Sequence, residues 1–449
     1  MQGRIRGLGA GRTYRYRFLR GTARSDVGSF RTAPSSRADA TVEFAWTGDT
    51  DFQRAAGQST PFWNNGEVFR RMRSERNHFN IHLGDTIYSD TEVPPPTPQQ
   101  PFPVALTVRD KWGKYKQNLN NRNLRSLRGA AGFYSHWDDH EFINDFSQRE
   151  NTFANAISGI TETIDGPTLY RRGVKAFTDY SPVTYSRANG IYRSVRWGRN
   201  LELFFLDERS FRDAKADEGG VCNNPETGEP DLAPTGPQDK RELFSVIAPS
   251  LKQPVSPACL AKIRDPNRDF LGDSQYRRFT RAIARSKARF KVVMNEMPIQ
   301  QYYALPYDRW EGYEAERQRL LTFLSRNVKN VIFLTTDVHA TLVNDARFQT
   351  LEPGGPKNSG IWDYTVGPAA TANFALEIDE VTSEGAGAAL RAAFLEPKPP
   401  AGVGMRCSVV DKFSYGQVKV TARALTVTSK GIDGRPLAGC KPLVLRYKR

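Results

Sequence analysis

Short apolar stretches that alternate with amphipathic helical stretches constrain the fold of this chain more than any other feature of its sequence. Apolar runs of this length, each ending at a polar residue or at Gly-Asp, predict buried β-strands, and their alternation with helices predicts an α/β core. Such sheets bind ligands beyond the carboxyl ends of their strands, so function is expected there. The predicted strands are residues 41–46, 79–83, 201–206, 290–295 and 331–335.

Helical periodicity and turn residues complete the predicted core. Arg-rich amphipathic stretches predict helices, and residues 417–428 alternate in the manner of an exposed edge strand near the C-terminus. Runs rich in Pro predict surface loops around the active face. The helices are expected near residues 64–75, 108–128, 273–288 and 313–326, and the loops at 94–103, 228–237 and 396–403.

The first 35 residues have a different pattern. A Gly turn is followed by aromatic and basic residues in strict alternation at 13–18, and residues 29–34 predict a second short strand. Two strands do not make a domain. We therefore expect residues 1–35 to be the last strands of an upstream β-sandwich, and residues 40–449 to form one large domain. No apolar stretch of signal-peptide length begins the chain, and any such peptide is expected to be missing with the upstream part.

Composition narrows the classes of ligand. The chain has 64 Lys and Arg against 49 Asp and Glu, and its net charge of +15 favours an anionic substrate, a polyanion or an anionic surface. Only four Cys and five His are present, which favours carboxylates as the ligands of any metal. No stretch approaches the roughly 18 apolar residues of a membrane-spanning helix, so no membrane span is expected.

The four cysteines lie in Gly- and Pro-rich surroundings and form no Cys-x-x-Cys motif. A zinc knuckle or a thioredoxin-like redox motif is therefore disfavoured. Pairing of neighbours along the chain predicts the disulfides Cys222–Cys259 and Cys407–Cys440. Four buried free thiols remain the alternative.

Acidic residues and histidines cluster where apolar stretches end. A single Gly-Asp is usually a turn, but four strand-end motifs in one chain indicate a site. Two cations held by such carboxylates can clamp a phosphoryl group and lower the pKa of a bound water, and Gly before Asp lets the backbone turn sharply at the metal. The motifs are Gly48-Asp49-Thr50-Asp51, Gly84-Asp85-Thr86-Ile87-Tyr88, Asp138-Asp139-His140-Glu141 and Asp337-Val338-His339.

These motifs resemble those of a known family. Together with Leu206-Asp207-Glu208-Arg209-Ser210-Phe211-Arg212, they are similar to the PhoD-like alkaline phosphatases, relatives of the purple acid phosphatases among the calcineurin-like metallophosphoesterases. The resemblance runs in family order along the whole chain. It implies an α/β (α+β) fold, a two-sheet β-sandwich flanked by helices, preceded by an immunoglobulin-like or fibronectin-like β domain of which residues 1–35 would be a remnant.

The resemblance also implies two or more metal ions. Asp85 would bridge them, and Asp51 is the reserve candidate for Asp49, as Asp138 is for Asp139. Two positions that hold His in the purple acid relatives are Asn295 and Asp337 here, so oxygen ligands favour Ca²⁺, Mn²⁺ or Mg²⁺ at the second metal, while a tyrosinate at Tyr88 suits Fe³⁺ at the first. The implied ligands are Asp49, Asp85, Tyr88 and His339 for the first metal, and Asp85, Asp139, Asn295 and Asp337 for the second.

Two further residues are expected to act on the substrate. His140 would face the phosphate, and it would stabilise charged oxygens or protonate the leaving oxygen. Arg209 would either hold phosphate oxygens through its planar fork or form a structural salt bridge. The remaining histidines, His78, His82 and His136, are expected to be structural.

The function expected is that of a secreted or cell-envelope phosphoesterase acting on phosphomonoesters or phosphodiesters. Loops such as 91–105 and 213–260 would select the substrate, and a monomer is favoured. A phospholipase D-like phosphodiesterase of the same family and a metal-binding but inactive relative are alternatives. An alternative of another class is a basic protein without catalysis that binds nucleic acid or another polyanion through the Arg-rich segments 69–73 and 122–128. No motif that reads a nucleic-acid groove accompanies these segments.

Overall fold

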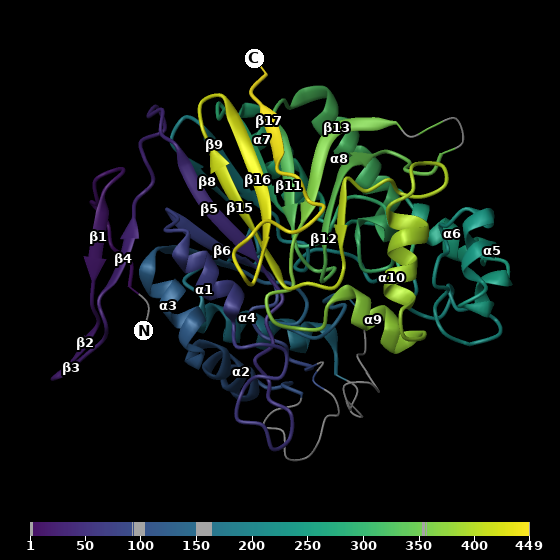
Figure 1. The fold of residues 1–449 in the computed structure, drawn as a ribbon, viewed down its shortest axis with the longest axis horizontal. Helices are drawn as coiled ribbons and strands as arrows, with labels where there is room; N and C mark the ends of the chain where they lie inside the picture. Colours follow the sequence, from purple (N-terminus) through teal and green to yellow (C-terminus); the bar gives the residue numbers. More distant parts are fainter. Residues whose placement is uncertain are drawn as a thin grey trace.

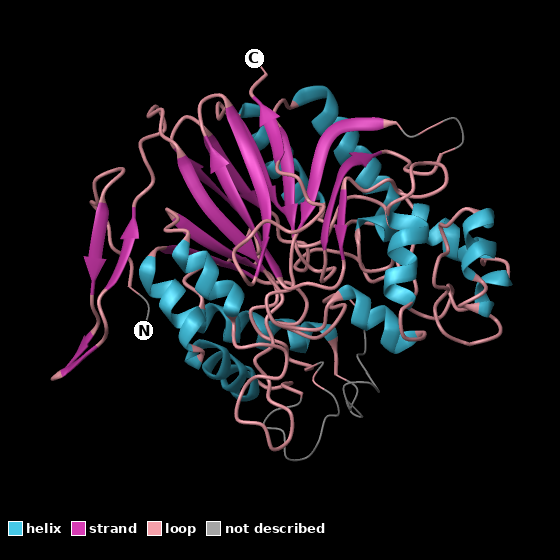
Figure 2. Cartoon of the chain, viewed as in Figure 1, coloured by secondary structure: helices cyan, strands magenta, loops and turns pink. Residues whose placement is uncertain are grey.

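Two β-sheets packed face to face form the centre of the computed structural model (Figures 1 and 2). The structure describes residues 3–448 apart from 92, 94–103, 150–163, 353–354 and 356. The larger sheet has the strand order β14-β12-β13-β11-β10-β9-β8, and the smaller has the order β17-β16-β15-β5-β6-β7. The strands of the larger sheet are β8 (Arg193–Trp197), β9 (Leu201–Phe205), β10 (Phe290–Met294), β11 (Val331–Thr335), β12 (Thr341–Arg347), β13 (Asn358–Thr365) and β14 (Cys407–Val409). Those of the smaller sheet are β5 (Val42–Thr47), β6 (Phe79–Leu83), β7 (Gly132–His136), β15 (Ser414–Val420), β16 (Ala424–Gly431) and β17 (Leu443–Arg446).

Each sheet contains a run of neighbouring parallel strands. In the larger sheet β9, β10, β11 and β13 run parallel, and in the smaller sheet β5, β6 and β7 do. All five strands predicted from apolar stretches are present within one residue of their expected ends, and all five are among these parallel strands. Every residue of β10 and of β11 is buried. Continuous apolar strands of this kind are typical of parallel sheets covered on both faces.

Large apolar side chains from both sheets interlock in the space between them. Trp46 and Phe79 of the smaller sheet belong to the same buried cluster as Phe205 and Val292 of the larger one. The indole N–H of Trp46 donates to the carbonyl of Thr335, 3.1 Å away, and thereby joins β5 to the end of β11. A polar contact inside this apolar layer fixes the relative position of two strands that both lead into acidic motifs.

Helices cover the outer faces of the sandwich (Figure 2). Apolar faces of α7 and α8 pack on the larger sheet, and those of α1 and α3 pack on the smaller one. The α-helices are α1 (Glu67–Ser74), α2 (Val108–Asn120), α3 (Arg122–Ala130), α4 (Gly166–Tyr180), α5 (Gln238–Phe244), α6 (Pro257–Arg264), α7 (Asp273–Arg285), α8 (Glu314–Asn327), α9 (Phe374–Val381) and α10 (Ala386–Leu390). Short helices of other types lie at Pro249–Lys252, Trp310–Tyr313 and Arg391–Leu395. None of the helices in the described part of the chain is long and apolar enough to cross a membrane.

Two sequence predictions were wrong in detail. The single helix expected at 108–128 is two helices, because Asn121 leaves the helical conformation and its side chain caps α3 by accepting from the N–H groups of Asn123 and Leu124. The edge strand expected at 417–428 is a hairpin of β15 and β16, and β15 lies inside the sheet between β16 and β5. The hydroxyl of Thr421 accepts from the N–H groups of Arg423 and Ala424 and makes this turn without glycine.

Both predicted disulfides are present, and no cysteine is free. Cys222–Cys259 ties α6 to the long excursion that follows β9. Cys407–Cys440 joins β14, at the edge of the larger sheet, to the segment that enters β17 at the edge of the smaller one. The second bond therefore ties the two sheets together at one edge of the sandwich.

The segment before residue 35 forms two small antiparallel pairs at one side of the sandwich (Figure 1). β1 (Thr13–Tyr16) pairs with β4 (Gly28–Arg31), and β2 (Leu19–Arg20) pairs with β3 (Ala23–Arg24). The hydroxyl of Ser29 donates to the carbonyl of Ala130 at the end of α3. Of the Pro-rich loops, 228–237 and 396–403 contain no extended helix or strand, while 94–103 lies outside the described residues.

Replacement of Gly416 by Ala tests the packing that holds the sheets in place. A Cβ at this position of β15 would overlap the indole ring of Trp46. Overpacking of a buried site costs about 1–3 kcal/mol, so we expect Gly416→Ala to lower the free energy of unfolding by at least about 2 kcal/mol. Lys419→Ala, at an exposed position of the same strand, is the control. Equal denaturant midpoints for the two variants would contradict this account.

Candidate metal centre

The carboxyl ends of inner strands from both sheets converge at one end of the sandwich. Asp49 follows β5, Asp85 follows β6 and Asp139 follows β7, while Asn295 and Asp337 follow β10 and β11. Backbone bonds hold neighbouring loops together: the N–H of Thr50 donates to the carbonyl of Asp85 over 3.0 Å. The hydroxyl of Thr336 donates to the carbonyl of Leu83 over 2.6 Å and joins the loops of the two sheets.

Four of the predicted ligands have left-handed backbone conformations. The φ angles are 59° at Asp49, 50° at Asp85, 71° at Asp337 and 48° at His339. Residues other than Gly rarely adopt positive φ, and such strain gathers at functional sites where surrounding structure maintains it. The strand ends are therefore bent so that several side chains point into one small volume.

Two glycines leave the space that these side chains occupy. Gly84 has a φ of 84°, and a Cβ there would lie 2.8 Å from the Cβ of Asp138. Gly367 has a φ of 126°, and a Cβ there would overlap Oδ2 of Asp49. Both positions therefore require glycine for conformation and for close approach.

The predicted ligands form overlapping groups in the described part of the chain. In each group one ligand atom of every residue lies within 4.8 Å of those of the others. Asp139 belongs to three of these groups and Asp85 to two, and a carboxylate shared between groups lies where a bridging ligand would lie. The groups are Asp49, Asp85 and His339; Asp85, Asp139 and His140; Asp138, Asp139 and Asp337; and Asp139, Asp145 and Asp308.

Tyr88 and His339 lie on one side of this cluster. The hydroxyl of Tyr88 is 2.8 Å from Nε2 of His339 and 3.5 Å from Oδ2 of Asp85. The other ring nitrogen of His339, Nδ1, bonds to the carboxylate of Glu377 on α9. A carboxylate behind a histidine in this way fixes its tautomer and turns Nε2 toward a metal.

Three buried oxygens of the cluster have no hydrogen-bond partner among the described residues. They are Oδ2 of Asp49, Oδ2 of Asp138 and Oδ1 of Asn295. A buried oxygen left without a donor costs about 1–3 kcal/mol, and three at one place are better explained by a cation that they would coordinate. The mainly oxygen donor set fits hard cations.

Asp49 and Asp51, the two alternatives for the first ligand, have different surroundings. Both carboxylate oxygens of Asp51 are used, one by the N–H of Gln53 and the other by the hydroxyl of Thr91. Asp49 lies in the cluster, and Asp51 is in none of the groups found among the described residues. Asp138 and Asp139 both lie in the cluster, but Asp138 also pairs with Arg209 through an N–O distance of 2.5 Å.

These buried carboxylates repel one another when they are ionised. Burial raises the pKa of Asp49 to about 7. Burial and the charge of Asp139 raise the pKa of Asp85 and of Asp337 well above the ordinary value. A raised carboxyl pKa means that the charged form is poorly stabilised, so this pocket favours a cation bound between its carboxylates.

Arg209 lies beneath the cluster and is completely buried. Its guanidinium contacts Asp138 and Asp308, at 2.5 and 2.8 Å, and lies 3.6 Å from Asp139. Arg212 also contacts Asp308, at 2.8 Å. Of the two roles expected for Arg209, these contacts are those of a salt-bridging arginine.

His140 is stacked on the ring of Tyr88, with ring centroids 3.9 Å apart. Its Nδ1 is 2.8 Å from Oδ1 of Asp90, and the second oxygen of Asp90 accepts from the N–H of Asn144. Although burial lowers the pKa of His140, the carboxylates of Asp90, Asp139 and Asp85 raise it well above the ordinary value. The ring is therefore held in one orientation, and the neighbouring carboxylates favour its protonated form.

The other three histidines lie outside the ligand groups found in the described residues. Nδ1 of His78 accepts from the N–H of Glu43, and Nε2 of His82 is 2.8 Å from the hydroxyl of Thr50. His136 is buried, with Nδ1 3.5 Å from a carboxylate oxygen of Glu296.

Sequence analysis assigned no role to Asp90, Asp308 or Glu377. Asp90 lies two residues after the end of the second motif and five residues after Asp85, so its place on the same loop was a usable signal. Glu377 lies on a helix 38 residues after His339, and Asp308 lies 99 residues after Arg209. A local sequence pattern cannot predict partners that lie so far apart in the chain.

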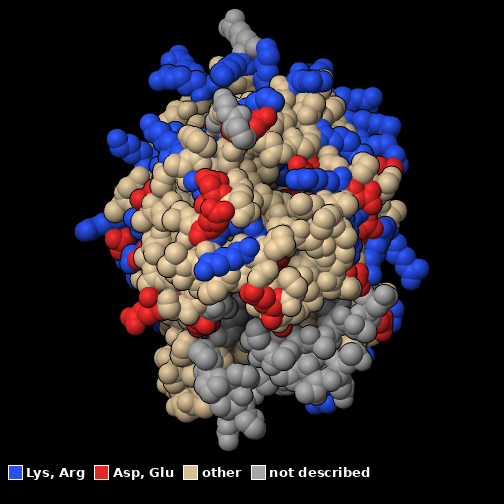
Figure 3. Space-filling model, turned by 90° about the vertical axis from the view of Figure 1, so that its right-hand side faces the viewer, with Lys and Arg blue, Asp and Glu red and all other residues tan. Residues whose placement is uncertain are grey.

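The Arg-rich segments lie on amphipathic helices. α1 buries Val68, Phe69 and Met72, and α3 buries Leu124 and Leu127, while most of their arginines face outward. On the face of the molecule in Figure 3, Lys and Arg gather along the upper rim and the edges, with Asp and Glu between them. That face carries no single continuous basic stripe.

Residues 52–428 match the family described as PhoD-like phosphatase, and the match begins directly after the first acidic motif. This chain belongs to the PhoD-like phosphatase family. The chain is 26% identical to alkaline phosphatase D of Bacillus subtilis (strain 168) over 357 residues, which cover 75% of this chain and 52% of that protein. The chain thus spans about half the length of this curated relative.

Solved structures confirm the predicted two-sheet fold. A structure of PhoD superposes with a TM-score of 0.68 at 19% identity, covering 97% of this chain and 74% of that one. The purple acid phosphatase PPD1 from yellow lupin (Lupinus luteus) seeds superposes with a TM-score of 0.53 at 12% identity, covering 98% of this chain and 60% of that one. The PhoD-like chain therefore has the metallophosphoesterase-like architecture expected from its motifs.

Replacement of Glu377 tests whether this carboxylate supports His339. Loss of such an outer partner typically weakens metal binding about 10- to 100-fold, and we expect Glu377→Gln to lose metal to a chelator at a correspondingly lower concentration. Glu380→Gln removes the same charge from an exposed position of α9 and is the control. Metal content after dialysis against graded chelator is the measurement. Equal retention in both variants would show that Glu377 does not support the ligand.

Proposed function

We propose that this protein is a metal-dependent phosphoesterase of the alkaline phosphatase D type that hydrolyses phosphomonoesters, phosphodiesters or both. The observation that carries the proposal is the position of Asp85, which is shared by two groups of buried ligand atoms. Membership of the PhoD-like phosphatase family supports the same reaction. The two disulfides support a secreted or cell-envelope location, where such bonds persist.

Two different metals fit the two halves of the cluster. The first half combines Asp49, Asp85, Tyr88 and His339, and a phenolate among its ligands favours Fe³⁺. The second half combines Asp85, Asp139, Asn295 and Asp337, and its ligands are all oxygen. Such a donor set favours Ca²⁺, with Mn²⁺ or Mg²⁺ as alternatives.

When bound, the cations supply Lewis-acid polarisation of the phosphoryl oxygens and a water acidic enough to act as the nucleophile. Residues of the protein hold the proposed ligands in position. Asp85 holds both halves of the cluster at a fixed distance, and Glu377 keeps His339 directed toward Tyr88 and Asp49. Arg209 spans Asp138, Asp139 and Asp308 from below and fixes their positions.

His140 is the proposed proton donor. Its Nδ1 is bound to Asp90, which leaves proton transfer to Nε2. A protonated imidazole beside the carboxylate cluster can stabilise the charged phosphoryl oxygens and then give its proton to the leaving oxygen. Asp90 maintains both the ring orientation and the charge that this role needs.

Replacement of Asp85 tests the proposed reaction. Asp85→Asn removes the charge of the proposed bridging ligand. Loss of a residue that only supports a ligand lowers activity by up to about 100-fold. We therefore expect hydrolysis of p-nitrophenyl phosphate and of its bis-ester to fall by more than about 100-fold. The circular dichroism spectrum should stay unchanged. Asp51→Asn is the control and should retain turnover, because both oxygens of Asp51 are bonded, to Gln53 and Thr91, and Asp51 is in none of the ligand groups that the described residues form. Turnover at the wild-type rate in Asp85→Asn would refute the proposed centre.

Visible absorption tests the first metal. A phenolate bound to Fe³⁺ gives a charge-transfer band, so we expect purified protein to absorb in the visible range and Tyr88→Phe to lose that band. Tyr115→Phe changes a second buried tyrosine, whose hydroxyl lies 3.4 Å from that of Thr86. It should keep the band. A colourless wild-type protein with one equivalent of iron would exclude Tyr88 as a ligand.

A further inference from the structure

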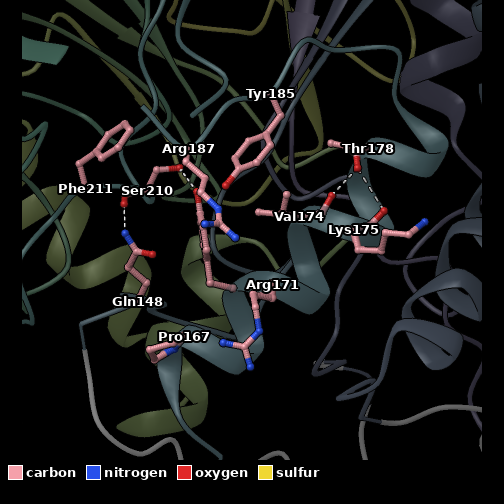
Figure 4. Close-up of a pocket in the computed structure, with 11 residues that line it drawn as sticks. Gln148, Pro167, Arg171, Val174, Lys175, Thr178, Tyr185, Arg187, Ser210 and Phe211 are labelled. Atoms are coloured by element: carbon pink, nitrogen blue, oxygen red, sulfur yellow. Dashed lines mark hydrogen bonds between the residues drawn. The ribbon is translucent and has the colours of Figure 1, made fainter. Parts of the chain in front are cut away.

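A cavity of about 520 Å³ lies beside α4, and no predicted metal ligand lines it. Its walls come from α4, from the turn before β8 and from the segment after β9 (Figure 4). Pockets of about 300–1,000 Å³ hold small organic ligands. The cavity is therefore large enough for a ligand of nucleotide size and is separate from the metal centre.

Basic residues border the cavity, and none of its described lining residues is acidic. Lys175 is paired with Asp179, whereas Arg171 has one hydrogen bond among the described residues, from its guanidinium to the neutral hydroxyl of Thr168, and its charge also acts on the exposed carboxylate of Asp165. Arg187 forms no hydrogen bond or ion pair among the described residues and lines the same cavity. Asp165 caps the start of α4 and does not line the cavity. Two guanidinium groups thus remain for an anion, and their planar forks suit phosphate oxygens.

Aromatic and polar side chains supply the rest of the site. The rings of Tyr170 and Tyr185 both line the cavity, 6.5 Å apart at 60°. In Figure 4 the Tyr185 ring and the Arg187 side chain extend from the same turn over the cavity, and Gln148 lies across from them. The amide of Gln148 donates to the carbonyl of Ser210 and is held in place. Tyrosine rings stack on heterocyclic bases with little dependence on the base.

We propose that this cavity is a second ligand site, for a small organic phosphate that carries an aromatic ring, of the nucleoside monophosphate class. Arg187 and Arg171 would bind the phosphate, and the tyrosine rings would contact the base. Ligand binding in the cavity would not require the metals. The two sites are nevertheless connected through the sequence, because Ser210, which lies on the cavity wall and bonds to Tyr170, directly follows Arg209.

Calorimetric titration of the metal-loaded full chain with the methylenephosphonate analogue of AMP tests this proposal, because an esterase cannot cleave the carbon–phosphorus bond. We expect two binding sites in the wild type, one at the metals and one in the cavity. Loss of a hydrogen bond between charged groups should weaken one site at least about tenfold in Arg187→Ala. Arg281→Ala removes an exposed arginine of α7, and both sites should keep their affinity.

Two comparisons decide the outcome. Removal of metal by a chelator should abolish the first site and leave the one that Arg187→Ala weakens. A single site that is lost with the metals and unchanged in Arg187→Ala would overturn the proposal. Inorganic phosphate and adenosine, titrated separately, should each bind the cavity at least about tenfold more weakly than the analogue. Equal affinity for inorganic phosphate would overturn the assignment of an aromatic ligand.

Discussion

Mutual repulsion among buried carboxylates is the constraint on which this structure depends. Asp49, Asp85, Asp139 and Asp337 are held together at the meeting point of two sheets, where burial and neighbouring charge raise the pKa of three of them. Isolated charges of this kind are too costly to bury unless they are paired or coordinate a metal. The strained backbone at Asp49, Asp85 and Asp337 persists because the sandwich is stable enough to maintain it. The packing of Trp46 across the two sheets serves that end, since it fixes the strands from which the ligand loops begin.

Permanent positive charge stabilises only part of the cluster that the described residues form. Arg209 and Arg212 hold Asp138 and Asp308. Oxygens of Asp49, Asn295 and Asp138 have no hydrogen-bond partner among the described residues. The contacts of Arg209 are those of a residue that positions the carboxylates, and bound cations would complete their neutralisation. His140 and His339 show the same arrangement, since each is oriented by a carboxylate behind it, Asp90 or Glu377.

Much of the fold and of the candidate site could be predicted from the sequence. Strands such as 79–83 and 331–335 have strong apolar signals because they are buried on both faces, and the acidic residues just after strands follow from how open α/β sheets bind ligands. The hairpin at β15 and β16 was missed because Thr421 makes the turn without a Gly or Asn signal. The partners Glu377 and Asp308 were missed because they come from distant segments, and only the folded chain brings them to His339 and Arg209. Local sequence thus indicates the candidate ligands, whereas tertiary packing selects the residues that contact them.

The carboxylate cluster is negatively charged, whereas the whole chain is positively charged. The proposed metals reconcile these two charges. An empty pocket of carboxylates would repel a phosphate ester, although the chain as a whole carries a net charge of +15. Four ligand carboxylates and one phenolate carry five negative charges, which one trivalent and one divalent cation would neutralise. The local repulsion would then vanish, and the field of the basic surface would attract an anionic substrate without opposition. The excess of Lys and Arg is therefore explained by attraction of an anionic substrate to the metal-loaded centre, and a nucleic-acid partner is not required to explain it.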